Sequence, residues 1–200
     1  MIDSLAALRG LYPPAKERSV RKQLSRLDRH CRRFIGLSPF VVLSSHGKDG
    51  QCDASPRGGE PGFVRAVDAN TLLIPDAPGN NRLDTLENIV ATGRLGLLFL
   101  VPGVDETLRV NGRARLVDDA PVLASLADEK RTPRLAIEVA VEDAYLHCAK
   151  ALMRSRLWDP TRKVERSVLP TMGQMLAEQT GMAGVAETQA EMLKRYQHDL

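Results

Sequence analysis

The sequence of 200 residues has few cysteines and no framework of paired ones. Cys31, Cys52 and Cys148 are widely spaced and include no C-x-x-C pair. An odd number of cysteines at such spacing is typical of a reduced, cytoplasmic protein and argues against a disulfide scaffold. The four histidines also lack a second ligand pair at zinc-like spacing, so we expect no metal site.

Long apolar segments are absent as well. The longest uncharged apolar stretch, Leu95 to Val104, covers ten residues and contains a proline and a glycine. A helix that crosses a bilayer needs about 20 apolar residues. Residues 1–33 contain no apolar block followed by a small-residue cleavage site, so we expect neither a membrane span nor a secretory signal.

The charge is nearly balanced overall but concentrated near the start of the chain. The net charge is +3, from 28 Lys and Arg against 25 Asp and Glu, and residues 1–33 have a net charge of +6 against −3 for the rest of the chain. Apolar residues at helical spacing predict one amphipathic helix with a basic outer face: Val20, Leu24, Leu27, Cys31 and Phe34. Such a face is typical of a nucleic-acid-binding module or of a solvated helix. No aromatic residue lies between Lys16 and Arg33 to stack a base, which favours the solvated helix.

After this helix the apolar pattern changes to the alternation of β-strands. Strands are predicted at 40–45, 52–57, 63–67, 71–75, 95–101, 108–116 and 135–142, and helices at 82–92, 144–154, 171–179 and 187–196. Close strands with a single intervening helix favour a mainly β protein with a closed or nearly closed antiparallel barrel and flanking helices. We expect the barrel over 1–165 and a helical appendage of the same domain over 166–200.

Common nucleotide-binding motifs are missing, but two short loops are suited to phosphate. GxGxxG, GxxxxGK[ST] and GxSxG do not occur. Gly79-Asn80-Asn81-Arg82 lies between a strand and a helix, and is equally suited to a phosphate cradle and to a plain helix cap. Arg57, followed by two glycines, predicts either a phosphate grip or an exposed turn. Two such loops at strand ends favour one shared phosphorylated ligand.

Five further segments follow one another in order along the chain: DASPRGG, GFVRAVDANTLLIPD, GNNRLDTLENI, GLLFL and TLRVNGRARLVDD. Together they resemble the pyridoxamine 5′-phosphate oxidase-like family of FMN-binding split barrels. SPRGG, IPD, GNNR and a late HCAKAL are similar to an uncharacterised branch of that family. The resemblance covers roughly residues 20–160. It implies a six-stranded antiparallel split barrel, a homodimer, and FMN held at the subunit interface.

The resemblance also implies cofactor-binding roles for individual residues. Ser55 and Arg57 match the strand along the flavin, and Pro75 and Asp76 match positions at the side of its ring. Asn80, Asn81 and Arg82 match the stretch that binds phosphate in the family. Many relatives have cationic side chains at two of these positions, where this sequence has asparagine. Lys150, Ser155 and Trp158 match further positions that contact the cofactor. Arg109 and Asn111 match positions that contact the cofactor of the partner subunit.

The resemblance implies an FMN-dependent oxidoreductase that transfers hydride between the flavin and an unidentified small molecule. The sequence shows no acid/base pair, so no catalytic residue is named. The Arg-x-His ending of true pyridoxamine phosphate oxidases is missing, which argues against vitamin B6 oxidation. Two alternatives stay open: a non-catalytic carrier or sensor of flavin, deazaflavin or haem, and a nucleic-acid-binding module.

Overall fold

The computed structural model describes residues 1–181 and 187–197. It divides into two compact units, Met1–Trp158 and the chain from Asp159 onward. The first unit contains every strand described below, and the second contains only helices. The expected domain boundary near residue 165 stays a prediction.

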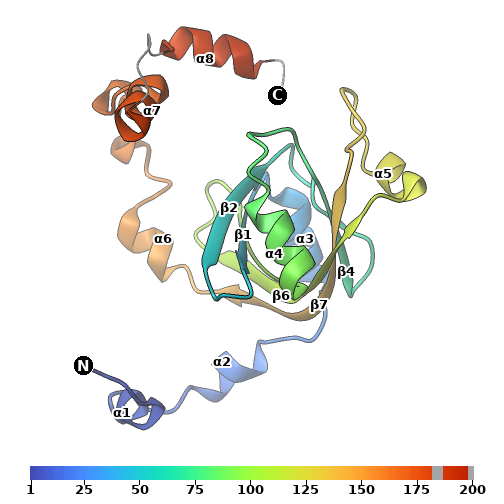
Figure 1. Cartoon of the computed structure of the whole chain (residues 1–200). Helices are drawn as coiled ribbons and strands as arrows, with labels where there is room; N and C mark the ends of the chain where they lie inside the picture. Colours follow the sequence, from blue (N-terminus) through green and yellow to red (C-terminus); the bar gives the residue numbers. More distant parts are fainter. Residues whose placement is uncertain (182–186, 198–200) are drawn as a thin grey trace. The chain divides into compact units, whose positions relative to one another are not determined.

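The strands of the first unit form one antiparallel sheet of seven strands (Figure 1). Its order is β2-β1-β5-β6-β7-β4-β3, and every neighbouring pair is antiparallel. The strands are β1 (Phe40–His46), β2 (Cys52–Gly58), β3 (Arg65–Ala66), β4 (Thr71–Pro75), β5 (Arg94–Leu100), β6 (Thr107–Val117) and β7 (Ala136–His147). This confirms the mainly β antiparallel fold, and the seventh strand is the two-residue β3.

Short helices flank the sheet in the first unit: α1 (Leu5–Gly10), α2 (Glu17–Arg21), α3 (Arg29–Leu37), α4 (Asp84–Thr92), α5 (Ala120–Ser125) and α6 (Lys150–Ser155). Helix α4 packs on β1, β2, β5 and β6, while α3 packs on β3, β6 and β7. In the view of Figure 1, α4 lies with β1 and β2 on one side and β4 and β7 on the other. The helix α4 is thereby held next to β2.

Alternation along the central strands separates a buried face from a half-buried outer face. On β6, Leu108 and Val110 are fully buried, whereas Arg109 and Asn111, which alternate with them, point outward and are half-buried. Side chains on successive strand residues point to opposite faces, which produces this pattern. Phe99 of β5 lies in the same core at 0% exposure. Burial of these apolar faces is the main driving force for the sheet.

The predicted helix over residues 20–34 is wrong. Helix α2 ends at Arg21 and α3 begins at Arg29. Between them, Leu24 exchanges two backbone hydrogen bonds with Ala144 of β7, at 2.9 and 2.8 Å. Asp28 then caps α3 by accepting a hydrogen bond from the Cys31 backbone N–H at 2.8 Å. The backbone pairing with β7 therefore overrides the helical pattern of the sequence.

The predicted helix over residues 144–154 is also wrong at its start. Strand β7 continues to His147, because residues 144–147 pair with residues 107–110 of β6. Helix α6 begins only at Lys150. The predicted strand at 63–67 is reduced to β3, while α1 and α5 were not expected from the sequence.

The second unit consists of short helical elements: η1 (Pro160–Arg162), η2 (Arg166–Val168), α7 (Met172–Thr180) and α8 (Gln189–Tyr196). Thr171 with Gln174, and Thr188 with Glu191, form capping boxes that fix where α7 and α8 begin. These two helices agree with the predicted segments. Across the described part of the chain, no helix combines the length and apolar character that a membrane crossing requires.

Candidate functional site

A single carboxylate joins β2 to the first turn of α4. Asp53 Oδ2 accepts hydrogen bonds from Thr85 Oγ1 of α4 at 2.6 Å and from Ser45 Oγ of β1 at 3.2 Å. Its other oxygen accepts from Ser55 Oγ at 3.0 Å. Asn88 extends the network by donating to Ser45 Oγ at 3.0 Å. Thr85 is only 1% exposed, so this network holds the strand that carries Ser55 and Arg57 against α4.

The two predicted arginines both act on this carboxylate. Burial would raise the pKa of Asp53, but the hydroxyl hydrogen bonds and the charge of Arg57 outweigh burial and lower that pKa. The pKa of Arg82 is raised mainly by its hydrogen bond and charge interaction with Asp84, with a further contribution from the charge of Asp53. Arg57 and Arg82 therefore lie within electrostatic range of the same carboxylate.

The loop before α4 adopts a strained backbone. Asn81 has a φ of 60° and Leu83 a φ of 44°, both in the left-handed region that side chains other than glycine rarely adopt. Asn80 Oδ1 accepts from the Arg82 backbone N–H at 3.1 Å, and Arg82 Nε donates to Asp84 at 2.8 Å. The helix begins after Leu83 without any side-chain cap. The asparagines therefore shape the turn before the helix and do not cap its first N–H groups, and a role of this loop in phosphate binding stays a prediction.

The glycine-rich end of β2 and the end of β4 meet at a small cavity of about 200 Å³. Gly58 and Gly59, which directly follow Arg57, line it together with Pro75 and Asp76. The segment between α5 and β7 closes the other side, and Asp76 is fixed there by a backbone hydrogen bond to Leu135 at 2.9 Å. The SPRGG and IPD segments of the sequence are thus neighbours in space.

Arg109 and Asn111 lie elsewhere on the sheet. They are on the outer face of β6, which β1 and β5 separate from β2. Asn111 donates to Asp143 of β7 at 3.0 Å, and Gly96 of β5 lies beside it, where a Cβ would come within 3.1 Å of Asn111 Oδ1. Arg109 donates to the hydroxyl of Tyr145 at 2.7 Å. The partners on β7 were not predicted as site residues, although its alternating pattern places them on the same face.

The three predicted residues near the end of the first unit make local contacts. Trp158 Nε1 donates to the Val104 carbonyl at 2.9 Å, which anchors the chain to the β5–β6 loop. Ser155 Oγ donates to the Leu152 carbonyl within α6 at 2.9 Å. Lys150 is exposed at the start of that helix. A role in cofactor binding stays a prediction for all three.

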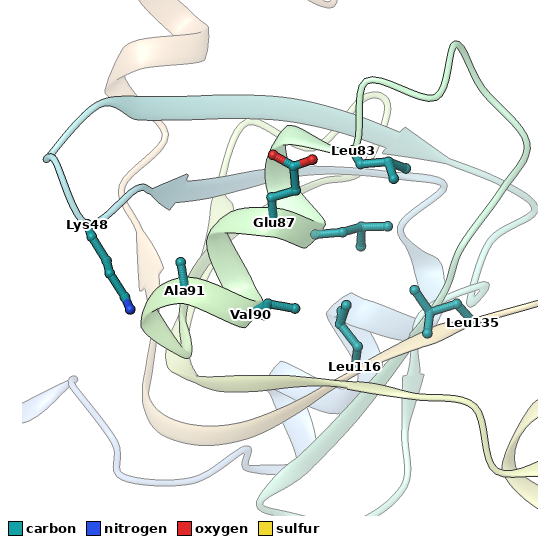
Figure 2. Close-up of a pocket in the computed structure, with 8 residues that line it drawn as sticks. Lys48, Leu83, Glu87, Val90, Ala91, Leu116 and Leu135 are labelled. Atoms are coloured by element: carbon teal, nitrogen blue, oxygen red, sulfur yellow. The ribbon is translucent and has the colours of Figure 1, made fainter.

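A larger, apolar groove lies beside α4 and contains none of the predicted site residues. Its volume is about 580 Å³. Figure 2 shows Leu83, Glu87, Val90 and Ala91 on the helix side and Leu116 and Leu135 across from them, with Lys48 at one end. Val90, an apolar residue of α4, is 75% exposed. Within residues 1–181 and 187–197, no group of three or more His, Cys, Asp or Glu side chains is arranged to hold a metal.

The low pKa of Asp53 predicts a pH-dependent stability. A carboxyl whose folded pKa is depressed stabilises the fold above its unfolded value of 3.8, and this contribution is lost as pH falls through the folded pKa. Asp53→Asn is expected to lower the free energy of unfolding at pH 7 by about 1–2 kcal/mol. It should also flatten the stability profile below pH 4. Urea titrations at pH 7 and at lower pH measure both effects.

Asp118→Asn, at an exposed position, is the matched control and should change stability by less than about 0.5 kcal/mol. Equal effects of the two substitutions would show that the network around Asp53 does not hold β2 to α4.

Comparison with known proteins identifies the fold family. The family model described as pyridoxamine 5′-phosphate oxidase matches residues 27–148. No curated protein sequence matches the chain. The solved structure of HupZ from Group A Streptococcus is 14% identical and has a TM-score of 0.50, over 60% of this chain and 93% of that one. At that identity the likeness shows the fold alone.

Two further solved structures are similar at lower scores. A conserved hypothetical protein from Mycobacterium tuberculosis is 14% identical with a TM-score of 0.47, over 72% of this chain and 94% of that one. A pyridoxamine 5′-phosphate oxidase-related, FMN-binding protein from Nostoc punctiforme is 13% identical with a TM-score of 0.42, over 57% of this chain and 76% of that one. The match to the family model spans more than half of the sequence, and the antiparallel sheet agrees with it. The chain therefore belongs to the pyridoxamine 5′-phosphate oxidase family.

Proposed function

We propose that this chain is a cytoplasmic FMN-dependent oxidoreductase that acts as a homodimer on a small-molecule substrate. The observation that carries the proposal is the contact between β2 and α4, where Asp53 binds Thr85 and both Arg57 and Arg82 lie in electrostatic range. Membership of the pyridoxamine 5′-phosphate oxidase family supports the same conclusion.

The residues on both sides of this contact have the chemistry that an FMN phosphate needs. A phosphate monoester binds best to several N–H donors together with positive charge. Arg82 uses one of its five N–H donors on Asp84, and Arg57 uses one on the Pro56 carbonyl at 2.9 Å. The remaining donors, with the amide of Asn81, are the groups that would hold the phosphate.

The cavity between the ends of β2 and β4 supports the assignment of the ring-side residues. Gly58 and Gly59 have no side chains there, and Pro75 and Asp76 present a rigid edge across from them. Ser55 is fixed by its hydrogen bond to Asp53. In the proposal, these residues orient the flavin ring while the arginines hold its phosphate.

The outer face of β5, β6 and β7 is the proposed dimer surface. Arg109 and Asn111 lie there half-buried, with their side chains fixed by Tyr145 and Asp143. Because β6 is separated from β2 by two strands, these residues suit the cofactor of a partner subunit better than that of their own. Gly96 has no side chain to displace that of Asn111, since a Cβ there would come within 3.1 Å of Asn111 Oδ1.

Bound FMN supplies the redox chemistry, since its ring accepts and donates hydride. The residues of this chain bind and orient the cofactor, and no catalytic residue is assigned. The free thiols Cys52 and Cys148 are exposed, which suits a reducing compartment.

Anaerobic mixing of the purified protein with NADH, NADPH and a panel of reduced small molecules tests catalysis. We expect at least one donor to bleach the bound flavin, and an oxidised acceptor to restore its colour with turnover. A flavin that stays oxidised with every donor would support the carrier or sensor alternative instead.

A further inference from the structure

The first 23 residues of the chain lie outside the core of the first unit. They include α1 and α2, and every one of them is exposed. Neither helix contains a buried residue. The backbone joins the sheet at Leu24, which pairs with Ala144 of β7. We call residues 1–23 the N-terminal arm, and the proposed function assigns no role to it.

Helix α1 has an apolar face. Leu5, Leu8 and Tyr12 are spaced by three and four residues, so they lie on one side of a helix. The Tyr12 backbone N–H donates to the Arg9 carbonyl at 3.3 Å, which continues the last turn as far as the tyrosine. Leu5 is 79% exposed and Tyr12 is 65% exposed. Large apolar side chains grouped in this way are typical of a surface that an apolar partner covers.

The N-terminal arm is also basic. It contains five Lys and Arg against two Asp and Glu, a net charge of +3. One of the two acids, Glu17, pairs with Arg21 at 2.8 Å. Within the described residues, Arg9 and Arg18 form no salt bridge. Cations beside an apolar helix face are complementary to a surface that presents anionic groups above an apolar layer.

A phospholipid bilayer matches both properties of the arm better than a nucleic acid does. DNA or RNA would attract the cations but would leave Leu5 and Leu8 in water. A bilayer accepts such side chains among its acyl chains, while long basic side chains keep their charge at the headgroups. Tyr12 suits the boundary between the two layers, because its ring is apolar and its hydroxyl is polar.

We propose that the N-terminal arm binds the surface of a bilayer that contains anionic phospholipids. Helix α1 lies at the boundary between headgroups and acyl chains, with Leu5 and Leu8 toward the acyl chains. Arg9 and Arg18 contact the headgroups. Attachment is peripheral and reversible, because one short helix buries few apolar side chains. The inference goes beyond the proposed function and does not depend on a bound flavin.

Sedimentation of the whole chain with sucrose-loaded vesicles tests the proposal. The vesicles consist of phosphatidylcholine alone, or of phosphatidylcholine with one third phosphatidylglycerol. We expect binding to the anionic vesicles and little to the neutral ones, and added salt should weaken it because exposed charges are screened. Leu8→Trp places a fluorescent ring on the apolar face. Its emission should shift to the blue with anionic vesicles, whereas that of Trp158 in the wild type should not.

Paired substitutions separate the apolar and the charged contributions. Leu5→Gln/Leu8→Gln should weaken binding to anionic vesicles by at least about tenfold. Arg9→Gln/Arg18→Gln should weaken it by roughly 30-fold. All of these side chains are exposed, so unfolding in urea should stay unchanged. The matched controls replace exposed residues outside the arm and should bind normally: Leu157→Gln/Leu169→Gln and Arg134→Gln/Lys163→Gln.

Three outcomes would overturn the inference. Equal binding to both kinds of vesicle, or binding that neither arm variant weakens, shows that the arm does not recognise anionic lipid. Binding to duplex DNA without binding to vesicles, weakened by Arg9→Gln/Arg18→Gln alone, shows that the arm is a nucleic-acid-binding segment. A smaller particle mass for Leu5→Gln/Leu8→Gln in sedimentation velocity, with no vesicle binding by the wild type, shows that a second copy covers the apolar face.

Discussion

Replacement of either arginine at the β2–α4 contact is expected to weaken FMN binding strongly. Arg57→Ala and Arg82→Ala should each cost about 1.5–3 kcal/mol, or roughly 10- to 150-fold in Kd, because each removes charge-assisted hydrogen bonds to the phosphate. Titration of FMN into protein stripped of cofactor, followed by flavin fluorescence, measures the Kd.

Charge and geometry contribute separately to this effect. Arg57→Lys keeps the charge but loses the planar fork, so its Kd should lie between those of the wild type and Arg57→Ala. The double variant should bind FMN too weakly to measure, because both arginines bind one phosphate in the proposed site. Arg33→Ala, at an exposed position on α3, is the control and should bind normally. Normal affinity for FMN in both Arg57→Ala and Arg82→Ala would contradict the assignment of the phosphate site to these two arginines.

Truncation of the largest core side chain is expected to be the most destabilising single change. Phe99 is 0% exposed and pairs across the sheet with Val41 on one side and Leu108 on the other. Phe99→Ala should lower the free energy of unfolding by about 3–5 kcal/mol, since it removes apolar contacts and leaves a cavity. Phe99→Leu, which fills most of the space, should cost less than about 1.5 kcal/mol.

Trp158 offers a probe for this measurement. It is the only tryptophan, it belongs to the first unit and its side chain is held by Val104, so its fluorescence in urea reports on unfolding of that unit. Val67→Ala, at an exposed position, is the control and should cost less than about 0.5 kcal/mol. If Phe99→Ala lowers the free energy of unfolding by no more than Val67→Ala does, the position of Phe99 at the centre of the core is contradicted.

The sequence was most informative where apolar residues alternate regularly. Thr71–Pro75 is observed as β4 with the bounds that were predicted, and the predicted strand at 108–116 lies within β6. These strands have local patterns that match their final environment. The fold class could therefore be predicted from pattern and resemblance together.

The two mistaken helices have a shared cause. Leu24 and Ala144 each lie in a segment with helical spacing, yet their backbones pair with each other. Such pairing depends on residues 120 positions apart, which no local pattern reports. Tertiary contact thus decided the structure of both segments.

The candidate site was predictable only in part for a similar reason. Motifs identified Arg57, Arg82 and the loops that carry them, and their assignment to a cofactor stays a prediction. Asp53, which joins those loops through Thr85, was not singled out, because an isolated aspartate on a strand has no distinctive spacing.

The identity of the bound chromophore tests the central claim most directly. An absorbance spectrum of the purified protein should show the visible bands of an oxidised flavin, and mass analysis of the molecule that heat releases should identify FMN. Protein that is colourless as purified and that takes up no FMN when the nucleotide is added would contradict it.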